Sequence, residues 1–599
     1  MSNDNLLKSD NCMKTNKYIG IMMLAAGMLT AASCSDFKDY NEAPKDALPA
    51  GNQTLWQNIQ QNSELSEFAQ LVRQSGFDAE LDNTKSYTVW APKNGSFSIA
   101  DYQGMSKEDL LQQFIKNHVA EYGHAASGAV SERVHTLNEK SYEFEGNGGQ
   151  YTFDGLTISQ PNLPGNNGLM HILDGAAPFR YNLYEYLKVA PGIDSLRNHF
   201  MRYEQTYLDE ANSVKGPMVN GMQTYIDSVM ITTNSLVNTL GGRIANEDST
   251  YTFIMPNDSA FMMMYNKVKP YYNYIATTKM HDVENFTKAG DTQTKSVTVN
   301  ASYMTDSLVR RTIVRNLIYS NNDNYNKWVV GEGEYTDTIR STVRRKFSNP
   351  KDIIEDYLVE APLPMSNGYA RIVDSLAFYP WETYCQEMEI SLLGNLVALF
   401  PNSAKGSNVT VRSLDGGPMT WLWGPETTET EYRFKRITPG GDRAKPDFYV
   451  SLPNVKSATY NFYVVFMPTD KLAGYDNRPN WLNFQLNYCD AKGALQTYNF
   501  SKEMADSLQS GGTLPKMPAS VNANTAFIND PTKTDSVFIG QFTFPVCYDG
   551  LGEEYYPSLR VTSPISVFNT QQLQTYTRDV CIAFILMKPV ELEEFEKQQ

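Results

Sequence analysis

The sequence predicts an α+β protein, with two successive α+β modules followed by an all-β, sandwich-like domain at the carboxyl end. The first observation is a repeat, because residues 88–97 read T-V-W-A-P-K-N-G-S-F and residues 252–261 read T-F-I-M-P-N-D-S-A-F. The second is an Asn-Gly turn leading into an alternating strand, which follows each copy at residues 167–174 and 367–374. The third is a change after Cys385 to short alternating apolar runs separated by turns, a pattern typical of a β-sandwich.

The amino-terminal segment is typical of a secretory signal. Lysines precede an uncharged apolar run from Tyr18 to Ala32, which at about 15 residues is shorter than the roughly 20 that a membrane-spanning helix needs. Ala31-Ala32-Ser33-Cys34 resembles a relaxed bacterial lipobox, in which the cysteine is lipidated and becomes the first residue. We therefore expect residues 1–33 to be a lipoprotein signal peptide and Cys34 to be the lipid anchor. An ordinary secreted product is the alternative.

Residues 34–50 are polar and acidic with no apolar period, which favours a flexible tether. This stretch resembles the acidic segment that follows the cysteine in Bacteroidetes-type lipoproteins exported to the outer face of the outer membrane. The resemblance implies an outer-membrane, lipid-anchored protein that faces the cell exterior. A plain solvated linker is the alternative.

Helical periodicity places the boundary between the two modules. Apolar residues recur at three- and four-residue steps from Leu55 to Val72, which predicts a pair of short amphipathic helices before the first strand. The same pattern begins again at Leu183. Module one is therefore expected at residues 51–181 and module two at residues 182–384.

The repeated blocks resemble those of the fasciclin (FAS1) domain, whose first block is similar to T-V-F-A-P-T-N-x-A-F and whose second is similar to N-G-x-x-H-x-I-D. The residues that carry the resemblance are Pro92, Asn94, Phe97, His118, His171 and Asp174 in module one and Pro256, Asn257, Phe261, Arg371 and Asp374 in module two. Module two departs from the pattern, since Arg371 replaces His171, Leu317 replaces His118, and about 35 extra residues near 262–305 follow its first block. The resemblance implies adhesion or partner binding rather than catalysis.

The histidines of module one, His118 and His171, allow two interpretations. One is a polar pair that influences adhesion, and the other is a pair of buried histidines satisfied by hydrogen bonds. The second interpretation is favoured, because module two has Leu317 and Arg371 at these places. In module two we also expect a helix near Thr305–Tyr319, capped by Thr305 or Asp306.

Residues 385–599 are expected to form the sandwich-like domain, with strands such as F-Y-V-S-L at 448–452. Exposed aromatic side chains stack on sugar rings and anchor protein interfaces. The candidate ligand or partner contacts are therefore the aromatic residues Trp421, Trp423, Trp481, Tyr271 and Tyr272. A place in the core is the alternative for the strand tryptophans.

Composition excludes several functional classes. The net charge of −16 opposes binding to nucleic acid. The chain has no G-x-S-x-G, H-E-x-x-H, Walker or G-x-G-x-x-G motif, so we expect no catalytic residue, no cofactor and no metal. All six histidines precede residue 282, so chemistry in the sandwich would have to depend on carboxylates. The cysteines of the body, Cys385, Cys489, Cys547 and Cys581, have no zinc-binding spacing, and the sequence leaves open whether they form disulfides or stay as buried thiols.

These observations together predict a surface-exposed lipoprotein that works as a non-enzymatic binding component. The expected setting is accessory capture of a glycan or peptide beside a SusC/SusD-like outer-membrane transporter. The alternative is an adhesin that engages host matrix or other cells through the fasciclin-like modules, and a carbohydrate-active enzyme comes third.

Overall fold

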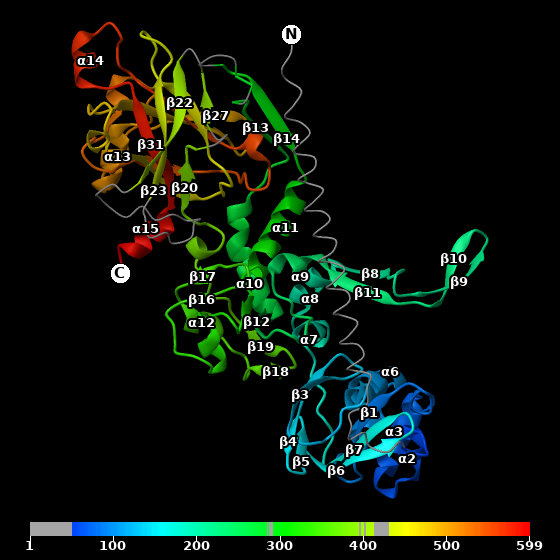
Figure 1. The fold of residues 1–599 in the computed structure, drawn as a ribbon. Coiled ribbons are helices and arrows are strands. Elements are labelled where there is room, and N and C mark those ends of the chain that lie inside the picture. Colours follow the sequence, from blue (N-terminus) through cyan, green and yellow to red (C-terminus); the bar gives the residue numbers. More distant parts are fainter. Residues whose placement is uncertain (1–50, 284, 287–290, 394–396, 401–402, 413–430) are drawn as a thin grey trace, which may run out of the picture. The chain divides into compact units, whose positions relative to one another are not determined.

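The computed structural model describes residues 51–283, 285–286, 291–393, 397–400, 403–412 and 431–599 (Figure 1). The chain divides into two compact units, residues 1–180 and residues 181–599. Among the described residues, no helix is both long and apolar enough to cross a bilayer.

Unit 1 is built around a seven-stranded sheet with helices before and after its first strand (Figure 1). The strands, in sheet order, are β2 (Val119–Glu121), β1 (Tyr87–Pro92), β7 (Gly168–Leu173), β6 (Leu156–Gly165), β5 (Gln150–Phe153), β4 (Ser141–Asn147) and β3 (Val130–His135). The helices are α2 (Leu55–Gln61), α3 (Ser66–Ser75), α4 (Asp78–Leu81), α5 (Ala100–Gln103), α6 (Lys107–Leu110), η1 (Ser63–Leu65), η2 (Leu111–Ile115) and η3 (Lys116–His118).

Strand β1 is buried along its whole length because both faces of the sheet are covered there. Its alternate side chains enter two separate cores, as the period of two along a strand requires. Tyr87 and Val89 pack with the helices, whereas Trp90 packs with Phe144 and Phe153 on the other side. The motif around Pro92 is therefore the centre of the unit rather than a surface loop.

The core of module two, in unit 2, repeats the strand pairing of module one. Its four-stranded sheet has the order β15 (Ile318–Ser320), β12 (Tyr251–Pro256), β19 (Gly368–Val373) and β18 (Leu363–Met365). Strand β1 runs parallel to β7 with Tyr87 opposite Gly168 and Pro92 opposite Leu173. Strand β12 runs parallel to β19 with Tyr251 opposite Gly368 and Pro256 opposite Val373. The two copies of each sequence block thus pair in one and the same register.

An asparagine holds each of these parallel pairs in the same way. Asn167 accepts a hydrogen bond from the backbone N–H of Leu55 at 2.8 Å, and its amide donates to the carbonyls of Leu81 and Asn83. Asn367 accepts from the N–H of Leu183 at 2.9 Å, and its amide donates to the carbonyls of Ile244 and Asn246. We call this arrangement the asparagine clamp, since it ties the first helix of each module and the loop before the first strand to the turn.

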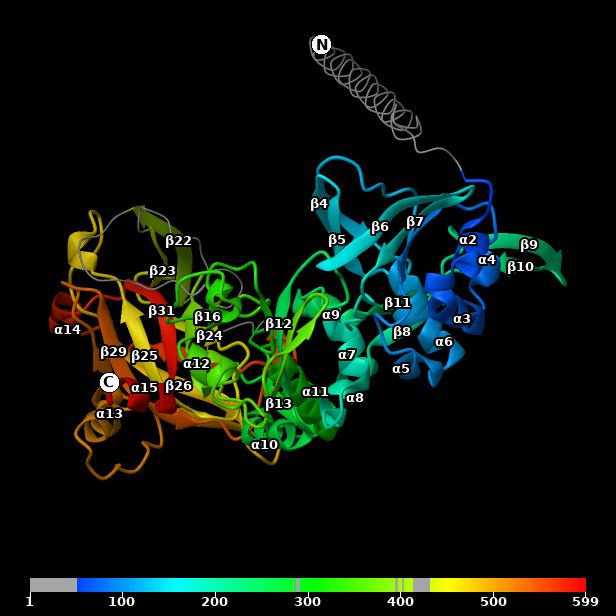
Figure 2. The same ribbon diagram turned by 90° about the horizontal axis from the view of Figure 1, so that it is seen from below.

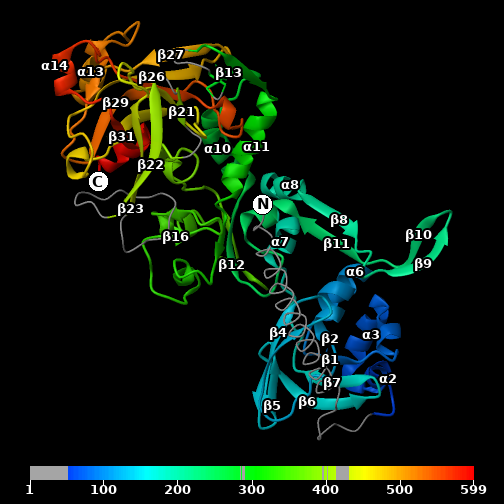
Figure 3. The ribbon, with the colours of Figure 1, turned by 45° about the horizontal axis from the view of Figure 1, so that its top comes forward.

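Module two carries two additions to this core, and the first is a β-ribbon between α8 (Asp194–Met201) and α9 (Ser235–Leu240). Its strands are β8 (Glu204–Leu208), β9 (Val214–Val219), β10 (Met222–Asp227) and β11 (Met230–Asn234). They form two two-stranded sheets, β8 with β11 and β9 with β10, and project away from the rest of unit 2 (Figures 1 and 3). We call residues 204–234 the arm.

The second addition follows the proline motif, where the sequence predicts extra residues. It comprises η4 (Lys269–Tyr272), β13 (Thr277–His281) and β14 (Thr294–Thr298), which lie between α10 (Asp258–Val268) and α11 (Ala301–Val314). The prediction of a helix near Thr305–Tyr319 was wrong at both ends. Asn300 caps the helix by accepting from the N–H of Tyr303, and the chain becomes strand β15 at Ile318. Thr305 instead donates its hydroxyl hydrogen to the carbonyl of Tyr272.

The carboxyl-terminal strands form two six-stranded sheets, a sandwich-like arrangement in which β25, β29 and β31 lie side by side in one sheet (Figure 2). The first sheet has the order β22 (Ala404–Arg412), β23 (Glu431–Pro439), β31 (Val580–Pro589), β25 (Thr459–Phe466) and β29 (Asp535–Thr543), with β20 (Met388–Ser391) on β31. The second has β21 (Val397–Leu399), β24 (Asp447–Ser451), β30 (Ser558–Thr562), β26 (Trp481–Cys489) and β27 (Leu495–Asn499), with β28 (Phe527–Ile528) on β26.

The remaining elements of unit 2 are short. The helices are α7 (Leu183–Val189), α12 (Pro350–Ile354), α13 (Lys502–Gln509), α14 (Thr570–Thr575), α15 (Val590–Glu596), η5 (Lys327–Val330), η6 (Pro380–Glu382), η7 (Thr469–Lys471), η8 (Ala523–Thr525) and η9 (Glu553–Tyr555), and the strands are β16 (Ile339–Arg340) and β17 (Lys346–Phe347). One continuous hydrophobic core runs from module two into the sandwich. Module two and the sandwich are therefore parts of one folded unit.

Candidate functional site

The histidine at the end of η3, His118, is fully buried in module one and has a partner for each ring nitrogen. Its Nδ1 lies 2.7 Å from the carbonyl oxygen of Phe114, and its Nε2 lies 2.8 Å from the backbone nitrogen of Ala177. Nδ1 therefore carries the hydrogen and Nε2 accepts from the N–H of Ala177. Burial lowers the pKa of His118 to about 4, so the ring is neutral at pH 7.

The second motif histidine, His171 on β7, is also buried and neutral. Its Nδ1 accepts from the N–H of Asn162, and its Nε2 donates to the carbonyl of His124 at 2.8 Å. The ring stacks against Trp90 with 5.7 Å between the ring centroids. Burial lowers the pKa of His171 to about 4. Both histidines thus link segments of backbone and offer no free nitrogen to a ligand.

In module two, other residue types occupy the positions that correspond to His118 and His171. Leu317 is a fully buried core residue, and Arg371 occupies the position of His171 in the strand register. The guanidinium of Arg371 donates to the carbonyls of Ile354 and Val329, so it too connects backbone segments around the sheet. Burial lowers the pKa of Arg371, and the guanidinium remains a cation at neutral pH.

The turn after the proline strand binds the first turn of an earlier helix in both modules, through Asn94 in module one and Asp258 in module two. In module one Asn94 accepts from the N–H of Glu67 in the first turn of α3. In module two Asp258 has the equivalent place, since its carboxylate accepts from the N–H of Ser195 in the first turn of α8. Asn257 instead caps its own helix, α10, by accepting from the N–H of Ala260.

The two motif aromatics serve the cores, since Phe97 packs against the helix side of module one and Phe261 is fully buried in module two. The motif acids lie just past the strands. Asp174 forms an exposed ion pair with Lys93 at 2.8 Å, and Asp374 is exposed. Exposed ion pairs contribute little to stability. Most of the eleven motif residues therefore have structural roles within the two modules.

The tyrosines expected to form a loop surface, Tyr271 and Tyr272, lie instead against the sandwich. Tyr272 is 3% exposed, its hydroxyl bonds with that of Thr312, and the Nζ of Lys456 lies 4.6 Å from its ring centre. The hydroxyl of Tyr271 donates to a carboxylate oxygen of Glu591 at 2.6 Å. Tyr272 is therefore part of the junction between module two and the sandwich and does not form an exposed loop surface.

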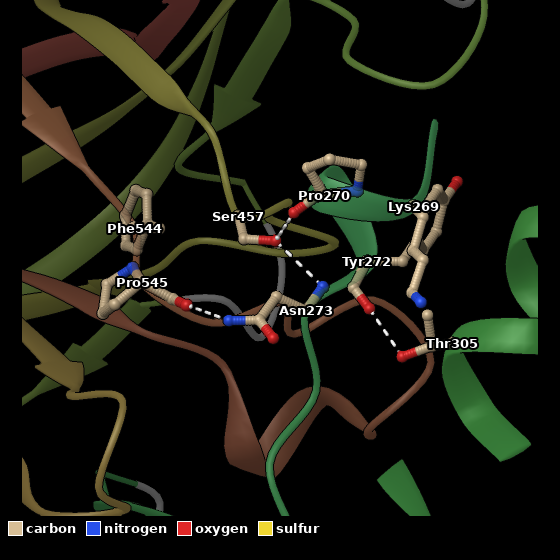
Figure 4. A pocket seen from close by; sticks show the side chains of 8 residues that line it. All are labelled: Lys269, Pro270, Tyr272, Asn273, Thr305, Ser457, Phe544 and Pro545. Atoms are coloured by element: carbon tan, nitrogen blue, oxygen red, sulfur yellow. Dashed lines mark hydrogen bonds between the residues drawn. The ribbon is translucent and has the colours of Figure 1, made fainter. Parts of the chain in front are cut away.

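A pocket of about 460 Å³ lies at this junction (Figure 4). Its lining comes from both parts of unit 2: Lys269, Pro270, Tyr272, Asn273, Thr305, Ser457, Phe544 and Pro545. Several polar groups of the lining are hydrogen-bonded to one another, since the hydroxyl of Ser457 donates to the carbonyl of Pro270 and accepts from the N–H of Asn273. The amide of Asn273 donates to the carbonyl of Pro545 at 2.7 Å. These hydrogen bonds connect module two to the sandwich, so the groups that make them serve the packing of unit 2 more than the binding of a ligand.

Module two contacts an ion pair of the sandwich. Lys456 and Asp549 form this pair, their side chains are 13% and 27% exposed, and the Nζ of Lys456 lies 4.6 Å from the ring centre of Tyr272 in η4. The hydroxyl of Tyr274 donates to the backbone carbonyl of Asp549 at 2.6 Å. The pair joins two segments of the sandwich, and Tyr272 and Tyr274 connect it to module two.

Of the three tryptophans expected to contact a ligand or partner, the structure describes only Trp481. Trp421 and Trp423 lie outside the described residues, and so does the proposed anchor Cys34. Trp481 opens β26 as a half-buried residue, with one face stacked on Tyr576 at 5.0 Å between centroids. Trp481 stays a candidate contact.

The four cysteines of the body are free and buried. Burial raises the pKa of Cys385 to about 12, so its thiol stays protonated and unreactive at neutral pH. The sequence alone left open whether these cysteines form disulfides.

Within the part of the chain that the structure describes, no group of three or more His, Cys, Asp or Glu side chains is arranged to hold a metal ion.

The asparagine clamp was missed at the sequence level. The Asn-Gly pairs at 167–168 and 367–368 were interpreted only as turns, although their asparagines occur in both copies of the block. That double occurrence was the signal for a side-chain role, since a turn alone accepts Asp or Gly before the glycine.

Comparison with known proteins supports this account for the first module. The fasciclin domain family matches residues 63–176. The chain is similar to a solved FAS1 domain pair from the insect cell adhesion molecule fasciclin I, with 11% identity, a TM-score of 0.20, and coverage of 54% of this chain and 99% of that one. That score is too low to carry an argument about the fold. No curated protein matches the chain. Residues 63–176 of this protein are a fasciclin domain, which indicates a cell-adhesion or binding role.

Proposed function

We propose that the chain is an outer-membrane lipoprotein, anchored through Cys34, in which two tandem fasciclin modules and a β-sandwich act together as a non-enzymatic binding component. The observation that carries the proposal is the repeated core. Both modules have a parallel pair in one register, and both have the same three-bond asparagine clamp on Asn167 or Asn367. This supports a second fasciclin module at residues 182–384, beyond the 63–176 that the family matches.

The chemistry of the described residues favours binding of a partner over catalysis on a substrate. The motif histidines His118 and His171 are neutral, and hydrogen bonds within the module occupy their nitrogens. A general base needs a pKa near the operating pH and a free nitrogen or oxygen toward the substrate. The surface is acidic overall, with 67 Asp and Glu against 51 Lys and Arg, which favours neutral or basic partners.

The finer setting that we propose is capture of a glycan or peptide beside a SusC/SusD-like transporter. The test is affinity purification of the full-length, carboxyl-terminally tagged chain from detergent-solubilised membranes after mild cross-linking. A co-purified transporter supports the proposal. A Cys34→Ser chain, which lacks the acceptor thiol but keeps every described residue, is the matched control, and it should lose the transporter together with the membrane fraction.

The second candidate function is adhesion to host matrix or other cells, which the fasciclin domain at residues 63–176 favours. The same purification separates the two. Recovery of a matrix or cell-surface ligand without a transporter supports the adhesin, whereas breakdown of an added glycan by the purified chain would reject both binding functions in favour of an enzyme.

A further inference from the structure

The arm, residues 204–234, exposes far more apolar surface than its share of the chain. Among the described residues, 21 large hydrophobic side chains are exposed, and eight of them lie in the arm. These are Tyr207, Val214, Met218, Val219, Met222, Ile226, Val229 and Met230. Met222 is 70% exposed and Ile226 is 76% exposed, which is unusual for residues in regular strands. Concentrated exposed apolar side chains mark an interaction surface.

The outer half of the arm is also incomplete as a sheet. Strands β9 and β10 pair only with each other among the described strands, and their pairing contains two register shifts. A lone two-stranded ribbon is marginally stable in water, whereas three or more strands can be stable. Strand β9 contains Gly216 and Pro217, which weaken strand pairing, and Pro217 has no N–H to offer a further strand. Strand β10, residues 222–227, contains neither residue type, so its outer edge is open to another strand.

The distribution of charged residues along the arm favours contact with a second copy of the chain. The chain has a net charge of −16, which opposes contact between copies over most of its surface. Residues 211–226 contain no Asp or Glu and one basic residue, Lys215, while Asp227 is the last residue of β10 and Glu210 interacts with Tyr225. Residues 222–226 of β10 therefore carry no charge of their own at neutral pH, which keeps the repulsion between two copies small along this stretch.

The apolar side chains of β10 suit pairing with a second copy. Met222 and Ile226 are the exposed large hydrophobic residues of this strand and lie two residues to either side of Thr224, so an antiparallel pair centred on Thr224 puts Met222 of each copy opposite Ile226 of the other. We propose that β10 pairs antiparallel with β10 of a second copy about a two-fold axis. The product is a four-stranded sheet with the order β9, β10, β10 and β9, in which both ribbons gain the strand that each lacks. An isologous contact of this kind closes on itself and does not propagate into fibres.

The first test is the mass of the chain from residue 35 onward in solution, measured by sedimentation over concentrations from about 1 to 100 μM, which covers dissociation constants of weak complexes. The wild-type chain should form a dimer. Gln223→Pro in β10 should weaken the dimer at least tenfold, because Met222 pairs with Val219 across the turn and the next N–H, that of Gln223, faces the outer edge. The matched control is Tyr303→Lys, which changes an exposed aromatic side chain on α11 outside the arm and should leave the dimer intact.

A shortened arm separates this effect from misfolding. The N–H of Asp209 donates to the carbonyl of Val229 at 2.8 Å, so an Asn-Gly turn in place of residues 210–228 closes β8 onto β11. This variant should melt like the wild type and be monomeric. A wild-type chain that stays monomeric throughout, or a shortened chain that dimerises as tightly as the wild type, overturns the proposal.

The second test locates the contact by hydrogen exchange at concentrations below and above the dimer dissociation constant. Amides of residues 222–227 should become protected in the dimer, whereas those of β8, residues 204–208, should not change. Protection confined to another part of the chain overturns the proposal. So does a monomeric chain that binds neutral lipid vesicles through the arm, since a membrane would then be the occupant.

Discussion

At the residue scale, the asparagine clamp makes the two modules comparable. We expect Asn167→Ala to cost about 2 to 4 kcal/mol of unfolding free energy, because the backbone N–H of Leu55 and the carbonyl of Leu81 would lose their side-chain partner in the interior. Asn367→Ala should have the same effect on unit 2. Denaturant unfolding of each variant checks this, with the exposed Asn408→Ala as the control that should change little. Equal, small losses for all three would show that the clamp does not stabilise the modules.

The motif histidines also make a prediction about pH. His118 and His171 have pKa values of about 4 in the folded chain against 6.5 for a histidine in water, so the unfolded state binds more protons between these values. The stability that the neutral rings provide is therefore complete above pH 6.5 and is lost as the pH falls towards 4, at up to about 3 kcal/mol for each histidine. Unfolding of unit 1 at several pH values should show this loss, and His118→Gln should reduce its slope. A slope that His118→Gln leaves unchanged would contradict the assignment.

At the element scale, each parallel strand pair begins at a glycine that no other residue can replace. Gly168 has φ of +146°, and a Cβ on it would lie 1.9 Å from the carbonyl oxygen of Tyr87. We expect Gly168→Ala to cost more than about 3 kcal/mol, since both the backbone conformation and the strand spacing must change. Thermal unfolding checks this. Gly104→Ala, in the same unit with open space around the site, is the control and should be nearly neutral.

Some strands and helices could be predicted from the sequence, and others could not, for physical reasons. The strands β1 and β7 could be predicted because each belongs to a sequence block that occurs twice, whereas their parallel pairing was seen only in the structure. The arm could not, because its strands lack a buried face and therefore show no period-two alternation of polar and apolar residues. The burial of Tyr272 was also hidden, since a tyrosine in an insertion has the same composition whether it faces solvent or the sandwich. The start of α11 was misplaced because Asn300 and Thr305 are both acceptable caps.

At the scale of the whole molecule, the Lys456–Asp549 ion pair of the sandwich is a place where Tyr272 and Tyr274 of module two make contact. Lys456→Met should destabilise unit 2 by about 1 to 2 kcal/mol, because it removes both the partner of the Asp549 carboxylate, which is 27% exposed, and the cation beside the ring of Tyr272. The double variant Lys456→Met/Asp549→Leu should recover a large part of this loss. Calorimetry checks both, and the transition of unit 1 should not move. If the losses of unfolding free energy from Lys456→Met and Asp549→Leu add fully in the double variant, the two side chains do not interact.

The account of function depends on a chain that is held outside the cell by a lipid on Cys34. The most direct measurement is the intact mass of the protein recovered from membranes, combined with added protease on whole cells. We predict a mature chain that starts at Cys34, carries the mass of a lipid group, and is digested from outside while periplasmic proteins stay intact. A chain without lipid that is recovered from the cytosol, or one that is protected from protease until the outer membrane is broken, would contradict the account.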